Sequence, residues 1–482
     1  MQKSQIQKIK KTTTKNVLFL SFRNLGMQAI STLGFFSLSI LLGTAEVGLF
    51  AIVAESVGIL GYFSDIGLAS ALIQQKDKIN KHQLKTTFTI QQALVFVSLF
   101  VLALSYHQIS LQKGYGPKEL WITVSLAFSF VCASLKTIPS VLLERKLNFK
   151  LISYVDLIEN ITFYVVAVVF ALLGFGAYSY AFAAFSRSLL GLILIYRFSP
   201  WPIGFAFSLP DVKKLFRFGI PFQFNSFIAM AKDRLSNLLV AGILGRSSFG
   251  LLAWAQKGTR IPLSLMDAVM KVTFPTFSRL QSQKEVLRKS IERSTFFIAL
   301  LTFPALTGIA LIAPDFIALI PKYGKWLPAL VPLYFYSASA AIASVTTPLT
   351  NAFNAVGKIT LTTKFMIMWT LLTWPTYFFL SKNFGYIGTS WAVLIVGSSS
   401  FVVWLTADKI FSVNIFKTVA SPFLSSVLMA LALLALPQTH LSAPLLLASK
   451  IITGLLVYSA YHLLFSLPQL KWFVNQLKSL RS

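Results

Sequence analysis

The sequence predicts an all-α protein that crosses a membrane many times. Hydrophobic residues make up 55% of the 482 residues, and charged residues only 12%. Apolar runs recur from one end of the chain to the other, and a run of about 20 residues crosses a hydrocarbon core about 30 Å thick. A segment in hydrocarbon must satisfy its backbone hydrogen bonds internally, which favours helices. Composition, run length and the uneven charge of the connections together indicate a polytopic membrane protein.

The number of predicted membrane helices is about fourteen. They cover residues 16–42, 48–75, 87–105, 119–141, 151–173, 177–197, 217–244, 249–278, 294–313, 327–352, 364–380, 385–406, 418–436 and 444–466. The first run is too long for a cleavable signal peptide. The two ends and the even-numbered connections carry 28 Lys and Arg residues, whereas the odd-numbered connections carry 6. Because basic loops remain in the cytoplasm, both termini are expected there.

The longest basic connection marks the predicted domain boundary. It covers about 198–216, contains three prolines and follows six spans. We therefore expect three parts in the chain. They are an N-terminal lobe with spans 1–6 at 1–205, a C-terminal lobe with spans 7–12 at 206–416, and spans 13 and 14 with a cytoplasmic tail at 417–482.

An internal repeat supports this division. A shift of 202 residues aligns Gly43 with Gly245, Gly48 with Gly250, and Asp65 with Asp267. The aligned Asp pair is informative, because a carboxylate within an apolar run is costly on its own. Parallel repeats of this kind form two lobes around a central cavity in transporters. A chance match of short Gly and Leu strings is the alternative.

Nine basic residues lie within the predicted spans. They are Arg23, Lys136, Arg187, Lys232, Arg234, Lys257, Arg260, Lys271 and Lys450. Charge at this depth is expensive and usually marks a substrate path, so clustered cations suggest that the cargo is an anion. Lys136 and Lys450 lie near helix ends, where anchoring is the simpler role. Arg187 lies in the middle of its span and is expected to pair with Asp156 or Glu159.

Five polar residues form a stripe along the eighth predicted span. They are Lys257, Arg260, Ser264, Asp267 and Lys271, whose spacing of 3, 4, 3 and 4 places them on one helix face. Such a face must contact water, another helix or a polar ligand. A simpler interpretation is a charge ladder between helices in which Asp267 balances Lys271. In the repeat Glu55 aligns with Lys257, and both a salt bridge that closes a gate and a direct ligand role fit this alignment.

Several classes of function are disfavoured by what the sequence lacks. Cys132 is the only cysteine and the four histidines are scattered, so no metal site is expected. We find no glycine loop for phosphate, no nucleophile elbow and no external carboxylate pair. The net charge of +28 lies on short loops rather than on a soluble basic face, which argues against nucleic acid. We expect no cofactor, no catalytic residue and no enzymatic activity.

Three stretches carry a resemblance to a known family. They are Gly48-Leu-Phe-Ala51 with Phe63-Ser-Asp-Ile-Gly-Leu-Ala-Ser-Ala-Leu-Ile-Gln74, Arg217-Phe-Gly-Ile-Pro221, and Val272-Thr-Phe-Pro-Thr-Phe-Ser-Arg-Leu-Gln281. With them the chain resembles the polysaccharide and lipopolysaccharide O-unit flippases, the polysaccharide transporter branch of the multidrug, oligosaccharidyl-lipid and polysaccharide exporter superfamily. The resemblance implies two six-helix lobes around a central cavity that opens alternately to the two sides, plus two C-terminal helices.

The resemblance also implies a cargo and a location. The cargo is an oligosaccharide linked to undecaprenyl diphosphate, carried from the inner to the outer leaflet of the cytoplasmic (inner) membrane. Relatives tend to carry an Asp in a motif like Asp-Asn-Leu-Leu, where this chain has Ser236-Asn237-Leu238-Leu239. Asp233 stands three residues earlier and is a candidate to supply that charge, so an ion-coupling role at Ser236 is open.

We therefore predict a flippase that moves a prenyl-diphosphate-linked oligosaccharide by alternating access, for biosynthesis of a cell-surface polysaccharide such as O-antigen, capsule or exopolysaccharide. The expected ligands of the diphosphate are the cations Arg23, Arg234, Lys257, Arg260 and Lys271, because Arg and Lys form charge-assisted bonds with phosphate oxygens. The expected gating or ion-coupling acids are Glu55, Asp65, Asp233 and Asp267. Expected partners are the lipid-linked oligosaccharide, membrane lipids and glycan polymerase machinery, but no nucleic acid.

Three alternatives remain at the level of sequence. A multidrug exporter of the same fold typically needs an acidic cavity for cationic drugs, whereas the cations here are in excess. A membrane-embedded glycan polymerase or ligase usually carries a large external loop, and the connections here are short. A structural scaffold for the glycan machinery would tolerate neutralisation of its intramembrane charges.

Overall fold

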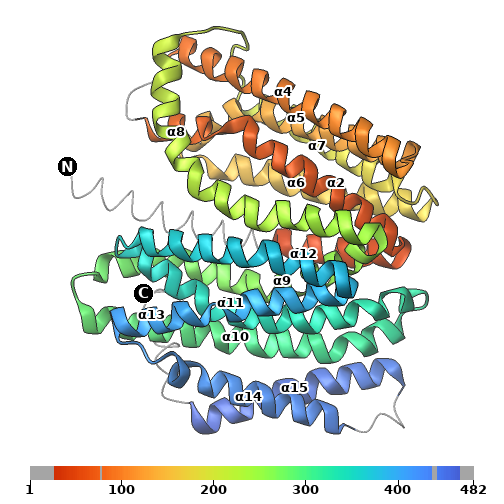
Figure 1. The fold of residues 1–482 in the computed structure, drawn as a ribbon, viewed down its shortest axis with the longest axis vertical. Coiled ribbons are helices and arrows are strands. Elements are labelled where there is room, and N and C mark those ends of the chain that lie inside the picture. Colours follow the sequence, from red (N-terminus) through yellow and green to blue (C-terminus); the bar gives the residue numbers. More distant parts are fainter. Residues whose placement is uncertain (1–25, 76–78, 437–441, 467–482) are drawn as a thin grey trace. The chain divides into compact units, whose positions relative to one another are not determined.

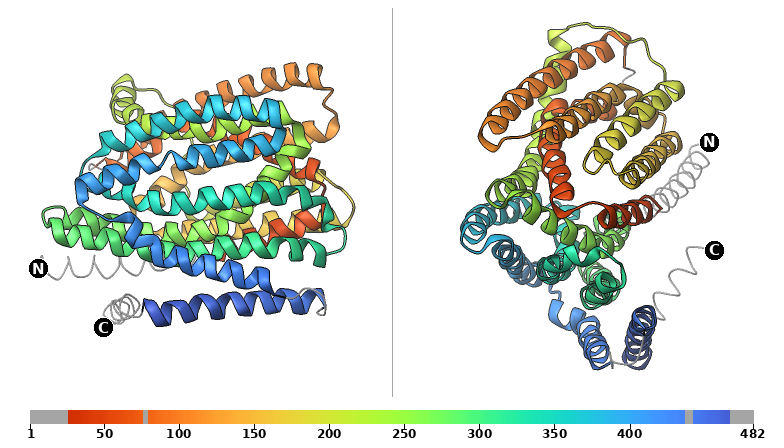
Figure 2. Two further views of the ribbon diagram at one scale, coloured as in Figure 1. Left: turned by 60° about the horizontal axis from the view of Figure 1, so that its bottom comes forward. Right: turned by 90° about the vertical axis from the view of Figure 1, so that its right-hand side faces the viewer.

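The protein is built from helices, which confirms the predicted fold class. The computed structural model describes residues 26–75, 79–436 and 442–466, and every regular element within these ranges is a helix (Figure 1). The chain divides into two compact units, Met1–Gly250 and Leu251–Ser482. Most of the helices are long, as Figure 2 shows in two further views.

The first unit contains the helices that precede Gly250. After an apolar helix at Gly26–Leu41 come α2 (Thr44–Asp65), α3 (Leu68–Gln74), α4 (Lys81–Lys113), α5 (Pro117–Arg145), α6 (Phe149–Leu172), α7 (Tyr178–Phe198), α8 (Leu209–Met230), the π-helix η1 (Ala231–Leu235) and the start of α9 (Ser236–Leu280). Within this unit α8 packs on α3 and α4, and η1 packs on α2.

The second unit contains the rest of α9 and the helices that follow it. These are α10 (Lys284–Leu319), the 3₁₀ helix η2 (Tyr323–Ala329), α11 (Leu330–Ala355), α12 (Ile359–Ser398), α13 (Phe401–Phe411), α14 (Ile415–Ala435) and α15 (Ala443–Phe465). Helix α10 is central to the unit, because it packs against α11, α14 and α15.

The predicted count of fourteen membrane helices is confirmed within the described residues. Eleven helical stretches are long and apolar enough to cross a membrane. Two of them, Phe227–Leu280 and Ile359–Phe411, are interrupted by the non-helical residues Gly245 (φ 76°) and Gly385 (φ 61°), so each makes two passes. These φ values lie in the left-handed region, where glycine has no side-chain penalty. The shorter apolar helix Gly26–Leu41 completes the fourteen.

The second predicted span differs from the structure because the helix breaks before its end. Ile66 (φ 41°) and Gly67 (φ 76°) separate α2 from α3. Carbonyls at the end of α3 accept hydrogen bonds from Arg145 of α5, whose Nη1 donates to the Leu72 carbonyl at 2.7 Å and to the Gln75 carbonyl at 2.6 Å. The hydrophobic run alone did not reveal this break.

The compact units do not coincide with the predicted lobes. The first unit extends to Gly250, inside α9, because α8 and η1 pack on helices α2, α3 and α4. The predicted boundary at 205/206 was drawn from the proline-rich connection and the repeat. It describes the division of the sequence into repeats, and in that sense it stays a prediction.

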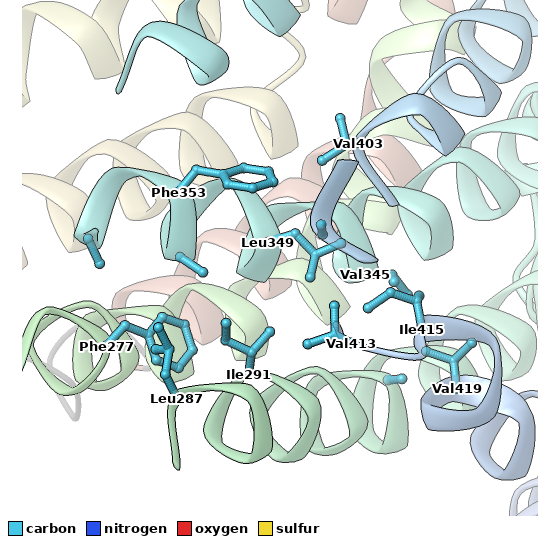
Figure 3. Close-up of a cluster of buried hydrophobic side chains, with 14 of the residues drawn as sticks. Phe277, Leu287, Ile291, Val345, Leu349, Phe353, Val403, Val413, Ile415 and Val419 are labelled. Atoms are coloured by element: carbon cyan, nitrogen blue, oxygen red, sulfur yellow. The ribbon is translucent and has the colours of Figure 1, made fainter. Parts of the chain in front are cut away.

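A hydrophobic cluster forms the centre of the second unit. Figure 3 shows side chains of α10 and α11 meeting those of α9, α13 and α14. Phe353 of this cluster is fully buried, with its ring stacked on Phe411 at 5.2 Å between centroids. Because these helices are also surrounded by apolar lipid, close packing rather than transfer from water holds this cluster together.

A buried ion pair fastens the C-terminal helix to α10. Lys450 of α15 donates from Nζ to Oδ2 of Asp315, and both side chains are largely inaccessible to solvent. On the same helix, the Tyr458 hydroxyl donates to the Leu300 carbonyl at 2.8 Å. Lys450 therefore anchors the helix pair α14–α15 to the second unit, which agrees with the anchoring role predicted for it.

Replacement of Lys450 by Met should destabilise the protein by about 3 kcal/mol, because it leaves the Asp315 carboxylate buried without a partner. The thermal unfolding of the detergent-solubilised protein measures this loss. Lys409→Met, which removes an exposed lysine, is the matched control. In the double variant Asp315→Asn with Lys450→Met the loss should be smaller. Equal losses from Lys450→Met and Lys409→Met would contradict the anchoring role.

Candidate functional site

A short π-helix carries the densest group of charges in the middle of the chain. The element η1 contains Lys232, Asp233 and Arg234 between the α-helices α8 and α9. A π-helix adds one residue to a turn, so side chains beyond it are rotated relative to a continuous α-helix. A π-helix also leaves backbone carbonyls without their usual partners. Here the Ser236 hydroxyl donates to the backbone carbonyl of Asp233 at 3.1 Å. Such single π turns occur frequently at functional sites.

Arg234 and Asn237 hold Glu55 between them. Nη1 of Arg234 donates to Oε2 of Glu55 at 2.9 Å, and Nδ2 of Asn237 donates to Oε1 at 3.1 Å. Both carboxylate oxygens of Glu55, on α2, thus accept hydrogen bonds from the segment that runs from η1 into α9. Glu55 therefore has partners within the first unit, so a gate formed by Glu55 with Lys257 is not required to balance its charge.

Gly58 makes room for this arrangement. It lies one turn after Glu55 on α2, and a Cβ atom added there would collide with Nη1 and lie 2.7 Å from Cζ of Arg234. The guanidinium therefore occupies the volume of the missing side chain. In the repeat, Gly58 aligns with Arg260. The first copy therefore has glycine at this position and receives Arg234 from η1, whereas the second copy carries its own arginine there.

The stripe on α9 contains an ion pair between two of its own residues. Nη2 of Arg260 donates to Oδ2 of Asp267 at 2.9 Å, two turns away on the same helix. Asp267 therefore pairs with Arg260 rather than with Lys271. Lys271 is exposed and has no ion pair with any residue that the structure describes. Lys257 is partly buried one turn before Arg260, and the face as a whole is basic.

Asp65 contacts the backbone rather than a cation. Its Oδ1 accepts from the amide of Ala69 at 3.1 Å, in the first turn of α3. Gly67, the residue before α3, has no side chain with which to cap that helix. Asp65 supplies the missing acceptor and adds a negative charge near the helix N-terminus, where it is favourable. Its predicted role in ion coupling stays a prediction.

Two predicted site residues remain, Asp233 and Arg23. Lys232 donates to the carboxylate of its neighbour Asp233, which is largely exposed. Arg23 lies outside the described residues. No three His, Cys, Asp or Glu side chains converge in the part of the chain that the structure describes.

A close helix crossing joins α2 to the start of α9 at the two glycines aligned by the repeat. A Cβ atom on Gly48 would collide with the carbonyl oxygen of Arg246, and one on Gly250 would collide with that of Thr44. Thr44 and Ser247 add a hydrogen bond between their hydroxyls at 2.7 Å. Only glycine at both positions allows the backbones to approach this closely.

Arg246 strengthens the same crossing from the side. Its guanidinium donates to Oε1 of the buried Glu119, at the first turn of α5. It also lies over the ring of Tyr115, with Cζ 5.3 Å from the ring centroid. The other oxygen of Glu119 accepts from the Gly116 amide at 2.9 Å. Helices α2, α5 and α9 are therefore joined at this crossing.

Two other intramembrane cations have structural partners. Lys136 of α5 donates to Oε1 of Glu159 on α6. Arg187 of α7 lies over the ring of Phe163, 5.0 Å from its centroid, and interacts electrostatically with Glu159. Gly191 lets the Glu159 carboxylate approach α7. Glu159, one of the two predicted partners of Arg187, is thus shared with Lys136, and these charges hold α5, α6 and α7 together.

Sequence reasoning missed the crossing at Arg246 and the partner of Glu55. The repeat contained a signal for the crossing, because glycines at matching positions of two helices commonly mark a close helix contact. Arg246 was counted only as a basic residue in an external connection. For Glu55 no sequence signal existed, because the π-helix that aims Arg234 at it is not visible in the hydrophobic periodicity.

Comparison with known sequences identifies the family. A family model described as polysaccharide biosynthesis protein matches residues 38–331. The chain is 26% identical over 429 residues to the teichuronic acid biosynthesis protein TuaB of Bacillus subtilis strain 168, covering 84% of this chain and 86% of that protein. It is also 26% identical over 369 residues to the lipopolysaccharide biosynthesis protein WzxC of Escherichia coli strain K12, covering 73% and 71%. The chain belongs to the polysaccharide biosynthesis protein family.

A solved structure shows the same fold. The lipid II flippase MurJ in an inward closed conformation matches with a TM-score of 0.74 and 13% sequence identity, covering 93% of this chain and 98% of that chain. At this identity the likeness concerns the fold alone. It agrees with the predicted class of polytopic helical membrane proteins.

Gly58→Ala should be less stable than Gly61→Ala by about 1 kcal/mol, because the methyl group added at position 58 displaces the Arg234 guanidinium from Glu55. Gly61→Ala is the matched control on the same helix, since a Cβ there meets nothing within 4 Å. Thermal unfolding in detergent measures both. In an Arg234→Ala background the difference between Gly58→Ala and Gly61→Ala should vanish. A penalty of the same size with and without Arg234 would show that the methyl group collides with something else.

Proposed function

We propose that the protein is a flippase that moves a prenyl-diphosphate-linked oligosaccharide from the inner to the outer leaflet of the cytoplasmic membrane. Membership of the polysaccharide biosynthesis protein family supports a glycan cargo. The names of TuaB and WzxC, which refer to teichuronic acid and lipopolysaccharide biosynthesis, support a cell-surface product. The fold shared with the lipid II flippase supports transport of a lipid-linked intermediate rather than its synthesis.

The observation that carries this proposal is the basic face of α9 together with the two arginine pairs. Arg234 and Arg260 are each bound by one carboxylate, and their side chains are 44% and 58% exposed. An ion pair this accessible contributes only about 0–1 kcal/mol. A diphosphate offers the same bidentate oxygen geometry with more charge, so it can displace the carboxylates from the guanidinium groups.

The diphosphate in this mechanism is bound by Arg234, Lys257, Arg260 and Lys271, with Arg23 near the cytoplasmic mouth. The displaced carboxylates of Glu55 and Asp267, together with Asp65 and Asp233, are the groups that can take up a proton or a sodium ion. Uptake of a cation by these acids would give alternating access its direction. The oligosaccharide follows the diphosphate, while the prenyl tail remains in lipid.

The orientation of the chain follows from its basic connections. Both termini face the cytoplasm, the lobes divide at 205/206 and 416/417, and the product passes to glycan polymerase machinery outside. In this orientation the crossing of α2 and α9 at Gly48 and Gly250 lies at the external end. Alternating access requires this crossing to open, because a bulky glycan cannot pass between backbones in contact.

Replacement of Lys257 and Arg260 by Ala should reduce transport at least about 100-fold, since two charge-assisted contacts contribute about 1.5–3 kcal/mol each. Surface glycan in a deletion strain and flipping of a lipid-linked oligosaccharide in proteoliposomes measure the effect. Lys289→Ala with Lys409→Ala removes two exposed lysines elsewhere and serves as the control. Normal glycan display by the double variant at normal protein levels would exclude the proposed site. Loss of resistance to cationic dyes, with glycan intact, would indicate a drug exporter instead.

A disulfide across the α2–α9 crossing should stop transport reversibly. Thr44→Cys with Ser247→Cys, in a Cys132→Ser background, places two thiols where hydroxyls lie 2.7 Å apart. Transport should cease on oxidation and recover on reduction, and the crosslink itself is measured by mass spectrometry. Ala45→Cys with Ser247→Cys tests for indirect effects of the substitutions. Full transport by the crosslinked protein would show that this crossing stays closed throughout the cycle.

A further inference from the structure

The connection between α7 and α8 exposes a row of large apolar side chains. It has no regular secondary structure (Figure 1), and we call residues 200–208 the linker strap. Ile203, Phe205 and Phe207 are 57%, 73% and 63% exposed, and the next residue of the row, Leu209 at the start of α8, is 61% exposed. Gly204, Ala206 and Ser208 alternate with them and are partly buried. A period of two is that of an extended chain with two different faces.

The inner face of the strap contacts α4. The Ala206 amide donates to Oγ1 of Thr89 at 3.1 Å. A Cβ atom on Gly204 would lie 2.9 Å from Cε and Nζ of Lys85, so the glycine leaves the space that the end of that lysine occupies. The strap is therefore held with its small residues against the helix and its large apolar residues directed away from it.

Both ends of the strap are fixed. Trp201 is buried, with its ring 5.2 Å from that of Phe88 and its Nε1 donating to the Tyr196 hydroxyl at 3.3 Å. At the other end Ser208 caps α8 by accepting from the Asp211 amide at 3.4 Å. The exposed row is thus part of an ordered connection, and its exposure does not result from a poorly packed loop.

The position of the strap along α4 indicates its depth in the membrane. Helix α4 carries Lys81 and Lys85 in its first turns and then no Lys, Arg, Asp or Glu as far as Gln112. That charge-free stretch is about 40 Å long, enough to cross the hydrocarbon core with one end near its boundary. The strap contacts Lys85, Phe88 and Thr89, where the charges end. It therefore lies at the level where lipid head groups meet acyl chains.

The charges beside the strap suit an anionic lipid surface. Lys81 and Lys213 are exposed and Lys85 is partly exposed on this side. The nearby acid, Asp211, lies 3.8 Å from the His82 imidazole. Farther along α4, Phe96 and other exposed apolar residues continue into the lipid-facing surface. An apolar row bordered by lysines, in continuity with a membrane-spanning surface, is the pattern of an interfacial anchor.

We propose that the linker strap is inserted in the membrane interface. Ile203, Phe205, Phe207 and Leu209 enter the acyl-chain region of the leaflet on the linker side, and the neighbouring lysines bind the phosphates of anionic phospholipids. The occupant of this apolar row is phospholipid. The anchor fixes the depth of the connection between the two sequence repeats, and it does not depend on the proposed cargo.

Spin labels on the full-length protein test this proposal. Single cysteines at Phe205, Phe207 and Ala206 are introduced into the Cys132→Ser background, labelled with a nitroxide and reconstituted in phosphatidylethanolamine and phosphatidylglycerol vesicles. Collision with oxygen reports lipid exposure, and collision with a water-soluble nickel chelate reports water exposure. Phe96→Cys is the lipid control and Lys289→Cys the water control, because both residues are exposed on their helices.

The expected result is an alternation along the strap. Labels at 205 and 207 should collide preferentially with oxygen, approaching the label at 96, whereas the label at 206 should be shielded from both reagents. Nickel collision at 205 and 207 equal to that at 289 would place the strap in water and overturn the proposal. Shielding of 205 and 207 from both reagents would show a protein partner instead and would also overturn it. Ile203→Cys replaces any variant that fails to elute as a folded protein.

Discussion

Polar groups inside a hydrocarbon layer must find their partners within the protein, and this constraint explains the internal contacts of the structure. Glu55 is held by Arg234 and Asn237, Asp65 by a backbone amide, and Lys450 by Asp315. The contacts of Glu55 and Lys450 join segments far apart in the chain, whereas the contact of Asp65 is local. The charges that are expensive to bury therefore also determine which helices lie together, since a helix that moved away would leave its partner unsatisfied.

Several glycines provide the space that long charged side chains occupy. Gly58, Gly191 and Gly204 lie opposite Arg234, Glu159 and Lys85, and in each case a methyl group would meet the end of the long charged side chain. A glycine in a helix costs about 1 kcal/mol relative to alanine. That cost is offset when the space lets a guanidinium or carboxylate reach its partner without displacing a backbone. Small residues thus decide which of the polar groups can meet.

The number of helices could be predicted because each needs a long apolar run, a property of local sequence. The partners within the site could not. The stripe on α9 was correctly placed on one face, yet Asp267 pairs with Arg260 rather than Lys271, because arginine can bend along two helical turns. Glu55 meets Arg234, which lies in a π-helix, and a hydrophobic periodicity of 3.6 residues does not reveal such a turn. The break at Ile66 was hidden by the uniform hydrophobicity around it.

The crossing of α2 and α9 has the form of a contact between two copies of one molecule. Gly48 touches the backbone of Arg246, and Gly250 touches that of Thr44; both pairs exchange under the 202-residue shift. Such reciprocity is the property of an isologous interface in a two-fold symmetric dimer. In such a dimer one substitution alters both sides of the contact at once. In this single chain the two sides are encoded separately, so Arg246 bonds to Glu119 while Thr44 bonds to Ser247.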